Sequence, residues 1–169
     1  MTRIRPAFLL ALAVLAACAS PPRGTVAPAP QPDPVSATGS APRDVPEFGR
    51  VVVESARTFL GAPYRYGGDD TGGIDCSGLV VRSFGAAGVS MPRTAAAQAA
   101  AGYHVGRPDL RAGDLVLFAG SGGSVGHVGI WIGGGRFIHA SSSRGVVVEQ
   151  LATRWFADRF VGGRRVLRR

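Results

Sequence analysis

The hydrophobic pattern changes after residue 112, and this change constrains the fold more than any other feature of the chain. Before it, apolar residues recur at helical spacing in residues 46–60 and again from residue 76, and Thr94 is placed to cap a short Ala-rich helix at 95–101. After it come short runs rich in Val, Ile and Phe with glycines between them, at 114–119, 126–132, 136–140, 146–150 and 159–167. Helices first and strands later predict an α+β fold, with N-terminal helices packed on a small antiparallel sheet.

The first 17 residues have the layout of a secretory signal peptide. Arg3 and Arg5 precede an apolar stretch, residues 7–17, that is too short to span a bilayer as a mature anchor. The stretch ends in Leu-Ala-Ala followed by Cys18, which resembles the bacterial lipobox, and this resemblance implies cleavage before Cys18 and lipidation of that residue. An ordinary signal peptide with a chance cysteine is the alternative.

The residues that follow the signal are expected to form a disordered tether. Residues 18–45 are rich in proline, alanine, serine and glycine, and have no apolar periodicity with which to bury a core. Acyl chains at Cys18 would anchor the protein to a membrane without spanning it. Because Ala19 follows the cysteine, a diderm host would place this exported bacterial lipoprotein at the outer membrane, on its periplasmic side. Residues 46–169 remain as one folded domain of ordinary size.

The positive charge of the chain does not indicate a nucleic-acid partner. The chain has 19 basic and 11 acidic residues, a formal charge of +8, and every basic residue is arginine. Its basic tail, residues 164–169, lacks interleaved aromatic residues and any recognisable nucleic-acid motif. A solvated tail is one interpretation, and attraction to an acidic cell-wall polymer is the other.

Cys76 is the candidate nucleophile. The chain has 2 cysteines, and Cys18 lies at the end of the predicted signal, so Cys76 has no intrachain disulfide partner in the mature domain. If the second helix begins at Cys76, the thiol faces unpaired N–H groups and the positive end of the helix dipole, which would lower its pKa. Asp75 is placed to cap that helix, Ser77 can serve at the same end, and Gly78 lets another segment approach closely.

Two histidines can supply the base that such a nucleophile needs. The midpoint of His127 and His139 falls in the glycine triplet 133–135, which is the expected hairpin turn. Residues equidistant from such a turn lie opposite each other on one face of the sheet, roughly 5 Å apart at Cβ. We therefore expect the two histidines to be direct cross-strand neighbours, one in contact with the thiol and the other orienting it. A Cys-His-His zinc site is the alternative, although no CxxC or HExxH-like spacing supports it.

Six short motifs follow one another along the predicted domain. They are Tyr64-x-Tyr66-Gly67-Gly68, Asp75-Cys76-Ser77-Gly78, Pro92-Arg93-Thr94, Gly113-Asp114-Leu115-Val116, His127-Val128-Gly129-Ile130 and Phe137-Ile138-His139-Ala140. In this order and spacing they resemble the NlpC family (NlpC/P60) of bacterial cell-wall cysteine peptidases, over about residues 48–165. The resemblance implies a papain-like cysteine peptidase fold, with the cysteine on a helix that packs against a sheet carrying the histidines. It makes residues 46–169 the catalytic domain.

The resemblance also implies a role for single residues. By position in the motifs, Cys76 is the nucleophile, His127 the base and His139 the polar orienting residue. Tyr64 matches the tyrosine that lines the active site and helps to hold the oxyanion. The neighbours of the cysteine, Asp75 and Ser77, are weaker candidates for substrate binding.

The activity implied is that of a peptidoglycan hydrolase. Such a cysteine endopeptidase cleaves stem-peptide or crosslink amide bonds of murein by acyl transfer, and it requires no cofactor and no metal. A lipid-anchored wall-binding module without catalysis, and an amidase or acyltransferase on the same fold, are the alternatives. We expect the choice of substrate to lie in loops such as 102–112 and 119–126.

Overall fold

The structure is a computed structural model that describes residues 44–167. The predicted signal peptide, residues 1–17, and the predicted lipidation site, Cys18, lie outside the described residues, as does nearly all of the predicted tether. Residues 44 and 45, expected to end the tether, instead belong to the first helix. No helix within residues 44–167 is both long enough and apolar enough to cross a membrane.

Two long helices precede the sheet, as the sequence predicts. They are α1 (Asp44–Arg57) and α2 (Cys76–Ala86). The first ends before the predicted residue 60, because the chain turns at residues 58–62 and then makes two backbone hydrogen bonds to Val146. The predicted start of the second helix, at Cys76, is confirmed.

A six-stranded antiparallel sheet follows, in the order β3-β8-β4-β5-β6-β7. Its strands are β3 (Tyr103–Val105), β4 (Leu115–Ala119), β5 (Val125–Gly133), β6 (Arg136–Ser141), β7 (Gly145–Gln150) and β8 (Phe160–Arg165). Five of them match the predicted runs. Strand β3 was missed, because three residues are too few to show an alternating pattern.

Several short elements complete the described part of the chain. They are the β1 (Asp69–Asp70) and β2 (Gly73–Ile74) hairpin, α3 (Ala95–Gln98), η1 (Arg107–Asp109), η2 (Ser121–Gly123) and α4 (Arg154–Ala157). The predicted cap of α3 is confirmed, since the Thr94 hydroxyl accepts a hydrogen bond from Ala97 N at 3.3 Å. The helix is shorter than the predicted 95–101, and α4 was not predicted.

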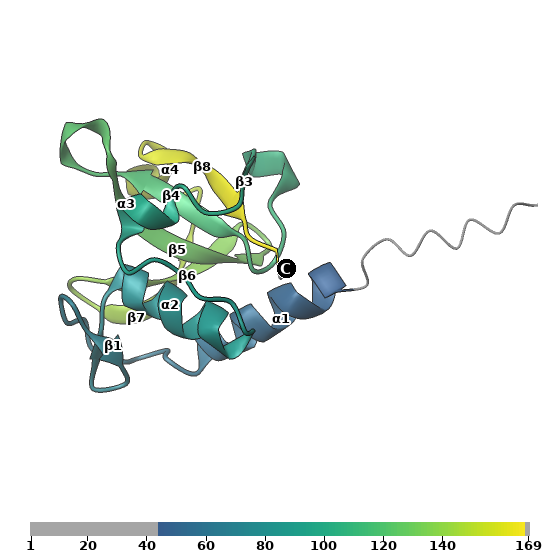
Figure 1. The fold of residues 1–169 in the computed structure, drawn as a ribbon. Coiled ribbons are helices and arrows are strands. Elements are labelled where there is room, and N and C mark those ends of the chain that lie inside the picture. Colours follow the sequence, from purple (N-terminus) through teal and green to yellow (C-terminus); the bar gives the residue numbers. More distant parts are fainter. Residues whose placement is uncertain (1–43, 168–169) are drawn as a thin grey trace, which may run out of the picture. The chain divides into compact units, whose positions relative to one another are not determined.

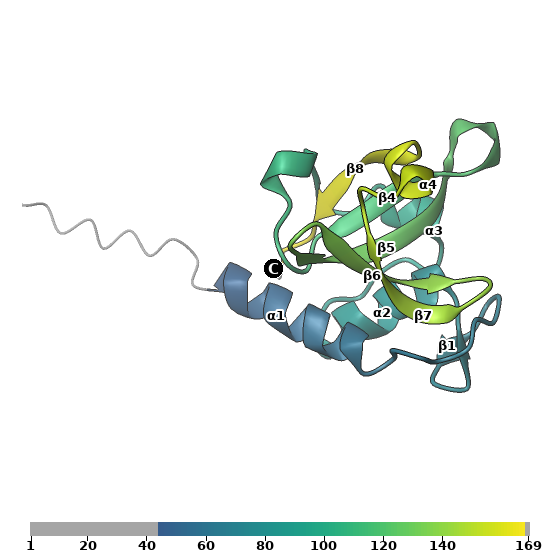
Figure 2. The same ribbon diagram turned by 180° about the vertical axis from the view of Figure 1, so that it is seen from behind.

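The sheet has an apolar cluster on each face. Along β4, Leu115 and Leu117 point to the face that α1 and α2 cover, while Val116 and Phe118 point to the face that α4 covers. Figures 1 and 2 show α1 and α2 together on one side of β5 and β6, with α4 on the other side. The predicted α+β architecture, with N-terminal helices on a small antiparallel sheet, is confirmed.

One buried ion pair joins the start of β4, the end of β8 and η1. Arg165 donates to both carboxylate oxygens of Asp114, at 2.8 and 2.7 Å, and to the carbonyl oxygen of Asp109 at 2.7 Å. Both side chains of the pair are nearly inaccessible to solvent. Loss of one partner would leave the other charge buried and unpaired.

We therefore expect Asp114→Ala to lower the free energy of unfolding by about 3–5 kcal/mol. The matched control is Glu47→Ala, which removes the exposed partner of Arg50 and should cost about 0–1 kcal/mol. Urea denaturation monitored by circular dichroism measures both changes. Equal effects of the two substitutions would contradict the structural role assigned to Asp114.

Candidate active site

Asp75 positions Cys76 at the start of α2. Its Oδ1 atom accepts a hydrogen bond from Gly78 N at 2.6 Å, which confirms the predicted cap, and its Oδ2 atom accepts one from Gly67 N at 2.9 Å. Gly78 has no room for a side chain, because a Cβ atom there would lie 2.3 Å from the carbonyl oxygen of Gly68. The chain before the helix is thus held against its first turn, and Cys76 is fixed between them.

Arg93 completes this arrangement from a distant part of the sequence. Its guanidinium donates to both oxygens of Asp75, each at 2.9 Å, to the Ser77 hydroxyl at 2.8 Å, and to the carbonyl oxygen of Gly68 at 3.0 Å. Burial raises the pKa of Asp75, but the hydrogen bonds from Arg93, Gly78 and Ser77 outweigh it, so the pKa lies below its ordinary value. The carboxylate therefore stays ionised in the neutral range.

The predicted substrate-binding residues have these internal partners and also border a cavity. Asp75 and Ser77 are both buried, and both line the cavity in front of Cys76. The hydrogen bonds that Asp75 and Ser77 make show that both residues hold the start of α2 in position. Their part in substrate binding stays a prediction.

Tyr64 is tied to the segment that leads into Cys76. It forms a parallel bridge with Ile74, supported by hydrogen bonds from Ile74 N to Pro63 O at 3.0 Å and from Arg65 N to Ile74 O at 3.2 Å. Burial raises the pKa of the Tyr64 phenol, and the proximity of Cys76 raises it further. The hydroxyl is therefore a protonated donor beside the thiol at neutral pH.

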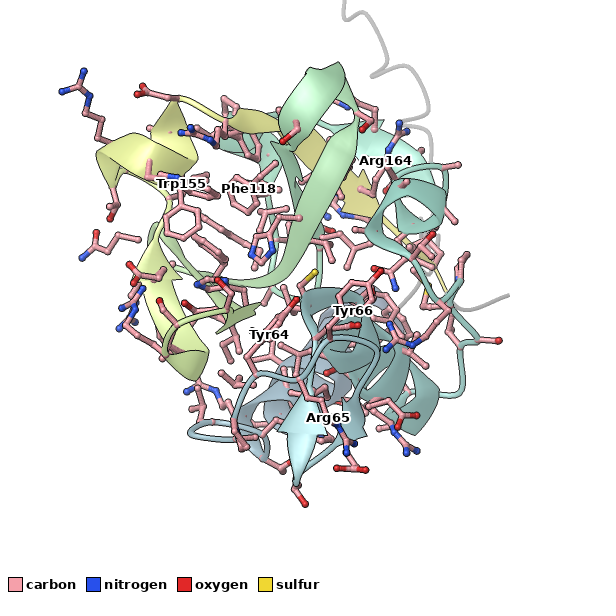
Figure 3. The ribbon with its side chains drawn as sticks, turned by 90° about the vertical axis from the view of Figure 1, so that its left-hand side faces the viewer. Tyr64, Arg65, Tyr66, Phe118, Trp155 and Arg164 are labelled. Atoms are coloured by element: carbon pink, nitrogen blue, oxygen red, sulfur yellow. The ribbon has the colours of Figure 1, made fainter. Side chains whose placement is uncertain are left out.

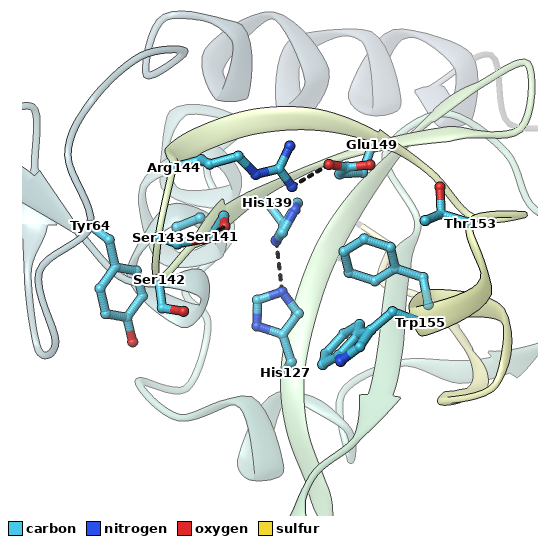
Figure 4. A pocket seen from close by; sticks show the side chains of 12 residues that line it. Tyr64, His127, His139, Ser141, Ser142, Ser143, Arg144, Glu149, Thr153 and Trp155 are labelled. Carbon is cyan, nitrogen blue, oxygen red and sulfur yellow. Dashed lines mark hydrogen bonds and ion pairs between the residues drawn. The ribbon is translucent and has the colours of Figure 1, made fainter.

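The two histidines are in contact, although not in the predicted register. His127 Nε2 and His139 Nδ1 lie 2.8 Å apart, and the rings are perpendicular (Figure 4). The prediction that they are directly opposite each other was wrong by two residues, because the pairing of Trp131 with Phe137 centres the hairpin on residue 134 and not on residue 133. A shift of two residues keeps both side chains on the same face of the sheet, so the rings still meet diagonally.

A second irregularity lies on the other side of His127. Strand β4 pairs Phe118 with His127 but Ala119 with Val125, so Gly126 is the extra residue of a bulge. Bulges beside functional sites change the direction of a side chain. The turn at the far end of the hairpin is made by Gly134 and Gly135, whose φ values of 60° and 78° favour glycine.

Burial keeps both imidazoles neutral. Desolvation lowers the pKa of His127 to about 4, and desolvation together with the proximity of His127 and Arg144 lowers that of His139 to about 3. The surroundings are aromatic, since Phe137 and Phe156 each lie with ring centroids 5.2 Å from that of His139. The Nε2 atom of His139 is buried and has no hydrogen-bond partner within the described part of the chain.

The predicted lowering of the Cys76 pKa was wrong for this environment. Burial is the largest influence and raises the pKa of the thiol above its ordinary value. The backbone N–H groups of Val128, Ser77 and Cys76 itself lower the pKa, but by less. At neutral pH the thiol and both imidazoles are therefore uncharged.

The site opens into two cavities that share Tyr64. One, of about 510 Å³, is lined by Cys76 with Asp75, Ser77 and Arg93, and the other, of about 540 Å³, is lined by both histidines. Figure 4 shows the second cavity, with Tyr64 on one side and Trp155 on the other. Figure 3 shows the same two residues across the wider site, with Phe118 near Trp155 and Tyr66 near Tyr64.

Some residues of these cavities were not predicted. Arg93 belongs to the Pro92-Arg93-Thr94 motif, but the sequence assigns it no role. No pattern in the sequence indicates that Arg144, Glu149 and Trp155 line a cavity. Of the loops expected to choose the substrate, 119–126 supplies lining residues to the cavity beside Cys76, but 102–112 lines neither cavity. Within residues 44–167 no group of three or more His, Cys, Asp or Glu side chains is arranged to hold a metal ion.

This combination of a cysteine at a helix start and paired histidines on a sheet matches known proteins. The profile of the NlpC/P60 family matches residues 61–165. The chain belongs to the NlpC/P60 family. The expected family, and with it the papain-like fold, is thereby confirmed.

Individual members show the same relationship. The chain is 43% identical over 120 residues to murein DD-endopeptidase MepS/murein LD-carboxypeptidase of Escherichia coli (strain K12), a match that covers 70% of this chain and 63% of the relative. It is 37% identical over 123 residues to the bifunctional muramidase/DL-endopeptidase CwlT of Bacillus subtilis (strain 168), covering 71% and 37%. The crystal structure of an NlpC/P60 family protein from Bacillus cereus superposes with a TM-score of 0.68 at 33% identity, covering 71% and 40%. The chain thus spans less than two thirds of the length of these proteins.

The neutral histidine pair predicts how stability depends on pH. In the unfolded chain the two imidazoles have pKa values near 6.5, so between about pH 6.5 and pH 4 the unfolded state binds more protons than the folded state. Stability should therefore fall as the pH is lowered through this window, by a loss on the order of a few kcal/mol between pH 7.5 and pH 4.5.

Urea unfolding of purified protein at the two pH values measures this loss. The variant His127→Gln/His139→Gln should lose much less stability on acidification than the wild type. The control is His104→Gln, which changes the third histidine, outside both cavities. If the double variant and the wild type lose the same amount, the two imidazoles are not neutral in the folded protein.

Proposed function

We propose that this protein is a cysteine endopeptidase that hydrolyses peptide bonds of peptidoglycan. The observation that carries the proposal is the contact of 2.8 Å between His127 Nε2 and His139 Nδ1. His127 lies on β5, and the next residue of that strand, Val128, directs its N–H group at the Cys76 thiol. A nucleophile, a base and a group that orients the base are the parts that acyl transfer requires. The names of the relatives support the substrate, since MepS is a murein endopeptidase and CwlT a DL-endopeptidase.

The tautomers of the histidines follow from their contact. His127 uses Nε2 to reach His139, so its Nδ1 atom is the one available to the thiol. For Nδ1 to accept a proton, Nε2 must carry a hydrogen and donate it to His139 Nδ1. His139 thus holds His127 in the tautomer that acts as a base.

The reaction then proceeds by proton transfer and two acyl-transfer steps. Cys76 Sγ attacks the carbonyl carbon as its proton passes to His127 Nδ1, and the Cys76 N–H and Tyr64 hydroxyl groups donate to the oxyanion. The protonated His127 gives its proton to the leaving amine, which leaves a thioester on Cys76. Water, deprotonated by His127, hydrolyses the thioester and restores the thiol. Asp75 and Ser77 border the acyl side of the site and are proposed to contact the substrate there.

The same fold allows other activities, and one experiment separates them. Purified protein is incubated with isolated sacculi, and the released muropeptides are identified by mass spectrometry. Release of peptides cut between D-Ala and diaminopimelate, or between D-Glu and diaminopimelate, supports an endopeptidase. An amidase would release stem peptides free of sugar, a wall-binding module would release nothing, and a zinc site at Cys76 would show as metal in the purified protein.

Cys76→Ala and Cys76→Ser should abolish muropeptide release, because the covalent intermediate cannot form on either side chain at a useful rate. The circular dichroism spectrum should be unchanged, which shows that the domain stays folded. Ser90→Ala, a change at an exposed hydroxyl outside both cavities, is the control and should retain activity. Near-normal release by either cysteine variant would rule out a cysteine peptidase.

We also propose that the protein is an exported lipoprotein held by acyl chains at Cys18, on the periplasmic side of the outer membrane. Residues 1–17 act as the signal peptide, 18–45 mainly as the tether, and 46–169 as the catalytic domain. The lipobox-like sequence before Cys18 and the Pro-rich composition after it support this organisation. Such a tether lets the catalytic domain reach peptidoglycan while the lipid stays in the membrane.

Cys18→Ser should move the protein from the membrane fraction to the soluble fraction, because the acceptor of the lipid is lost. Hydrolysis of sacculi by the purified variant should equal that of the wild type, since the catalytic groups lie elsewhere. Fractionation followed by immunoblotting measures the first outcome. A variant that still sediments with membranes would contradict the lipid anchor and leave the hydrolase proposal intact.

A further inference from the structure

The two cavities divide the proposed catalytic groups between them. Cys76, which retains the acyl group, lines one of them, and His127, which must protonate the departing amine, lines the other. A general acid has to lie within hydrogen-bond reach of the atom it protonates. The cavity of about 540 Å³ beside the histidines is therefore the side on which the amine product leaves.

Arg144 projects into this cavity with much of its hydrogen-bonding capacity unused. The residue lies in the turn between β6 and β7, and its side chain is 55% exposed. Among the described residues Glu149 is the one acceptor that its guanidinium contacts, through a single nitrogen (Figure 4). A guanidinium carries five N–H donors, so most of them remain available to a ligand.

The second arginine of the site differs in this respect. Arg93, in the cavity beside Cys76, donates to Asp75, Ser77 and the carbonyl oxygen of Gly68. Its charge and donors are committed to the start of α2. Of the two arginines, Arg144 is the one that is equipped to bind an anion.

The surroundings of Arg144 suit a carboxylate on a short aliphatic chain. Glu149, whose side chain is only 15% exposed, fixes one edge of the guanidinium, and three consecutive serine hydroxyls, Ser141, Ser142 and Ser143, line the same cavity. Trp155, half-exposed, supplies an apolar wall. Arginine recognises carboxylates through paired N–H donors, and such charge-assisted bonds are stronger than neutral ones.

We propose that this cavity binds a free carboxylate of the diamino acid whose amine leaves, with Arg144 as the binding residue and Glu149 as the residue that positions Arg144. The inference rests on the proposed function. Cleavage between D-Ala and diaminopimelate, or between D-Glu and diaminopimelate, frees an amine of diaminopimelate. The side-chain stereocentre of this amino acid carries a carboxyl group. Amidation of that group removes its charge, so the cavity selects non-amidated peptidoglycan.

The test compares two muropeptide dimers that differ only at this group, one with the free carboxylate and one with the carboxamide. Purified full-length protein should cleave the carboxylate form with a kcat/KM about 10- to 100-fold higher. Arg144→Gln should abolish the preference by slowing cleavage of the carboxylate form alone. Arg144→Lys, which keeps the charge but not the paired donors, should retain part of the preference.

The matched control is Arg154→Gln, which removes the same charge from the exposed face of α4, where the side chain is 95% exposed. This variant should keep the full preference, and the thermal midpoints of all variants should agree. Equal cleavage of both dimers by the wild type, or an unchanged preference in Arg144→Gln, overturns the inference and leaves the proposed function standing. Failure of the wild type to cleave either dimer or sacculi overturns both.

Discussion

The carboxylate of Asp75 is the group on which the geometry of the site depends. It accepts hydrogen bonds from the loop before α2, from the first turn of α2 and from Arg93, so that three segments meet at two oxygen atoms. Burying a carboxylate is unfavourable unless such bonds replace its hydration, and here they do so well enough to lower its pKa. Because Cys76 is the next residue, the hydrogen bonds that hold Asp75 also fix the position of the cysteine backbone.

Desolvation then determines how charge can arise in the site. The same burial that raises the pKa of Cys76 lowers those of His127 and His139, so none of the three carries a charge at rest. In a site of low polarity, a thiolate and an imidazolium that form together stabilise each other more than they would in water. The aromatic residues around the histidines thus favour a proton transfer between neighbours over ionisation of either group alone.

The sequence predicted what local pattern controls and missed what distant contacts decide. The helix at Cys76, its cap by Asp75 and five of the six strands of the large sheet follow from periodicity and short-range chemistry. The bulge at Gly126 and the register shift after Trp131 do not, because backbone irregularities in a sheet depend on its neighbouring strands. The histidine contact was still predicted correctly, because the observed pairing differs from the expected one by two residues, and a difference of one would have put the rings on opposite faces.

The two arginines of the site also show the difference between what local sequence reveals and what distant contacts decide, and this difference bears on specificity. Arg93 stands 18 residues from Asp75 in the sequence, and nothing in the local pattern reveals that it is committed to that carboxylate. Arg144, in contrast, lies in a turn that borders the histidines and has donors to spare. The arginine of the cavity beside Cys76 is therefore committed to internal hydrogen bonds, while the arginine of the cavity beside the histidines keeps N–H donors available to a ligand. Under the proposed mechanism, a change in this turn would alter which substrate is bound without moving Cys76, His127 or His139.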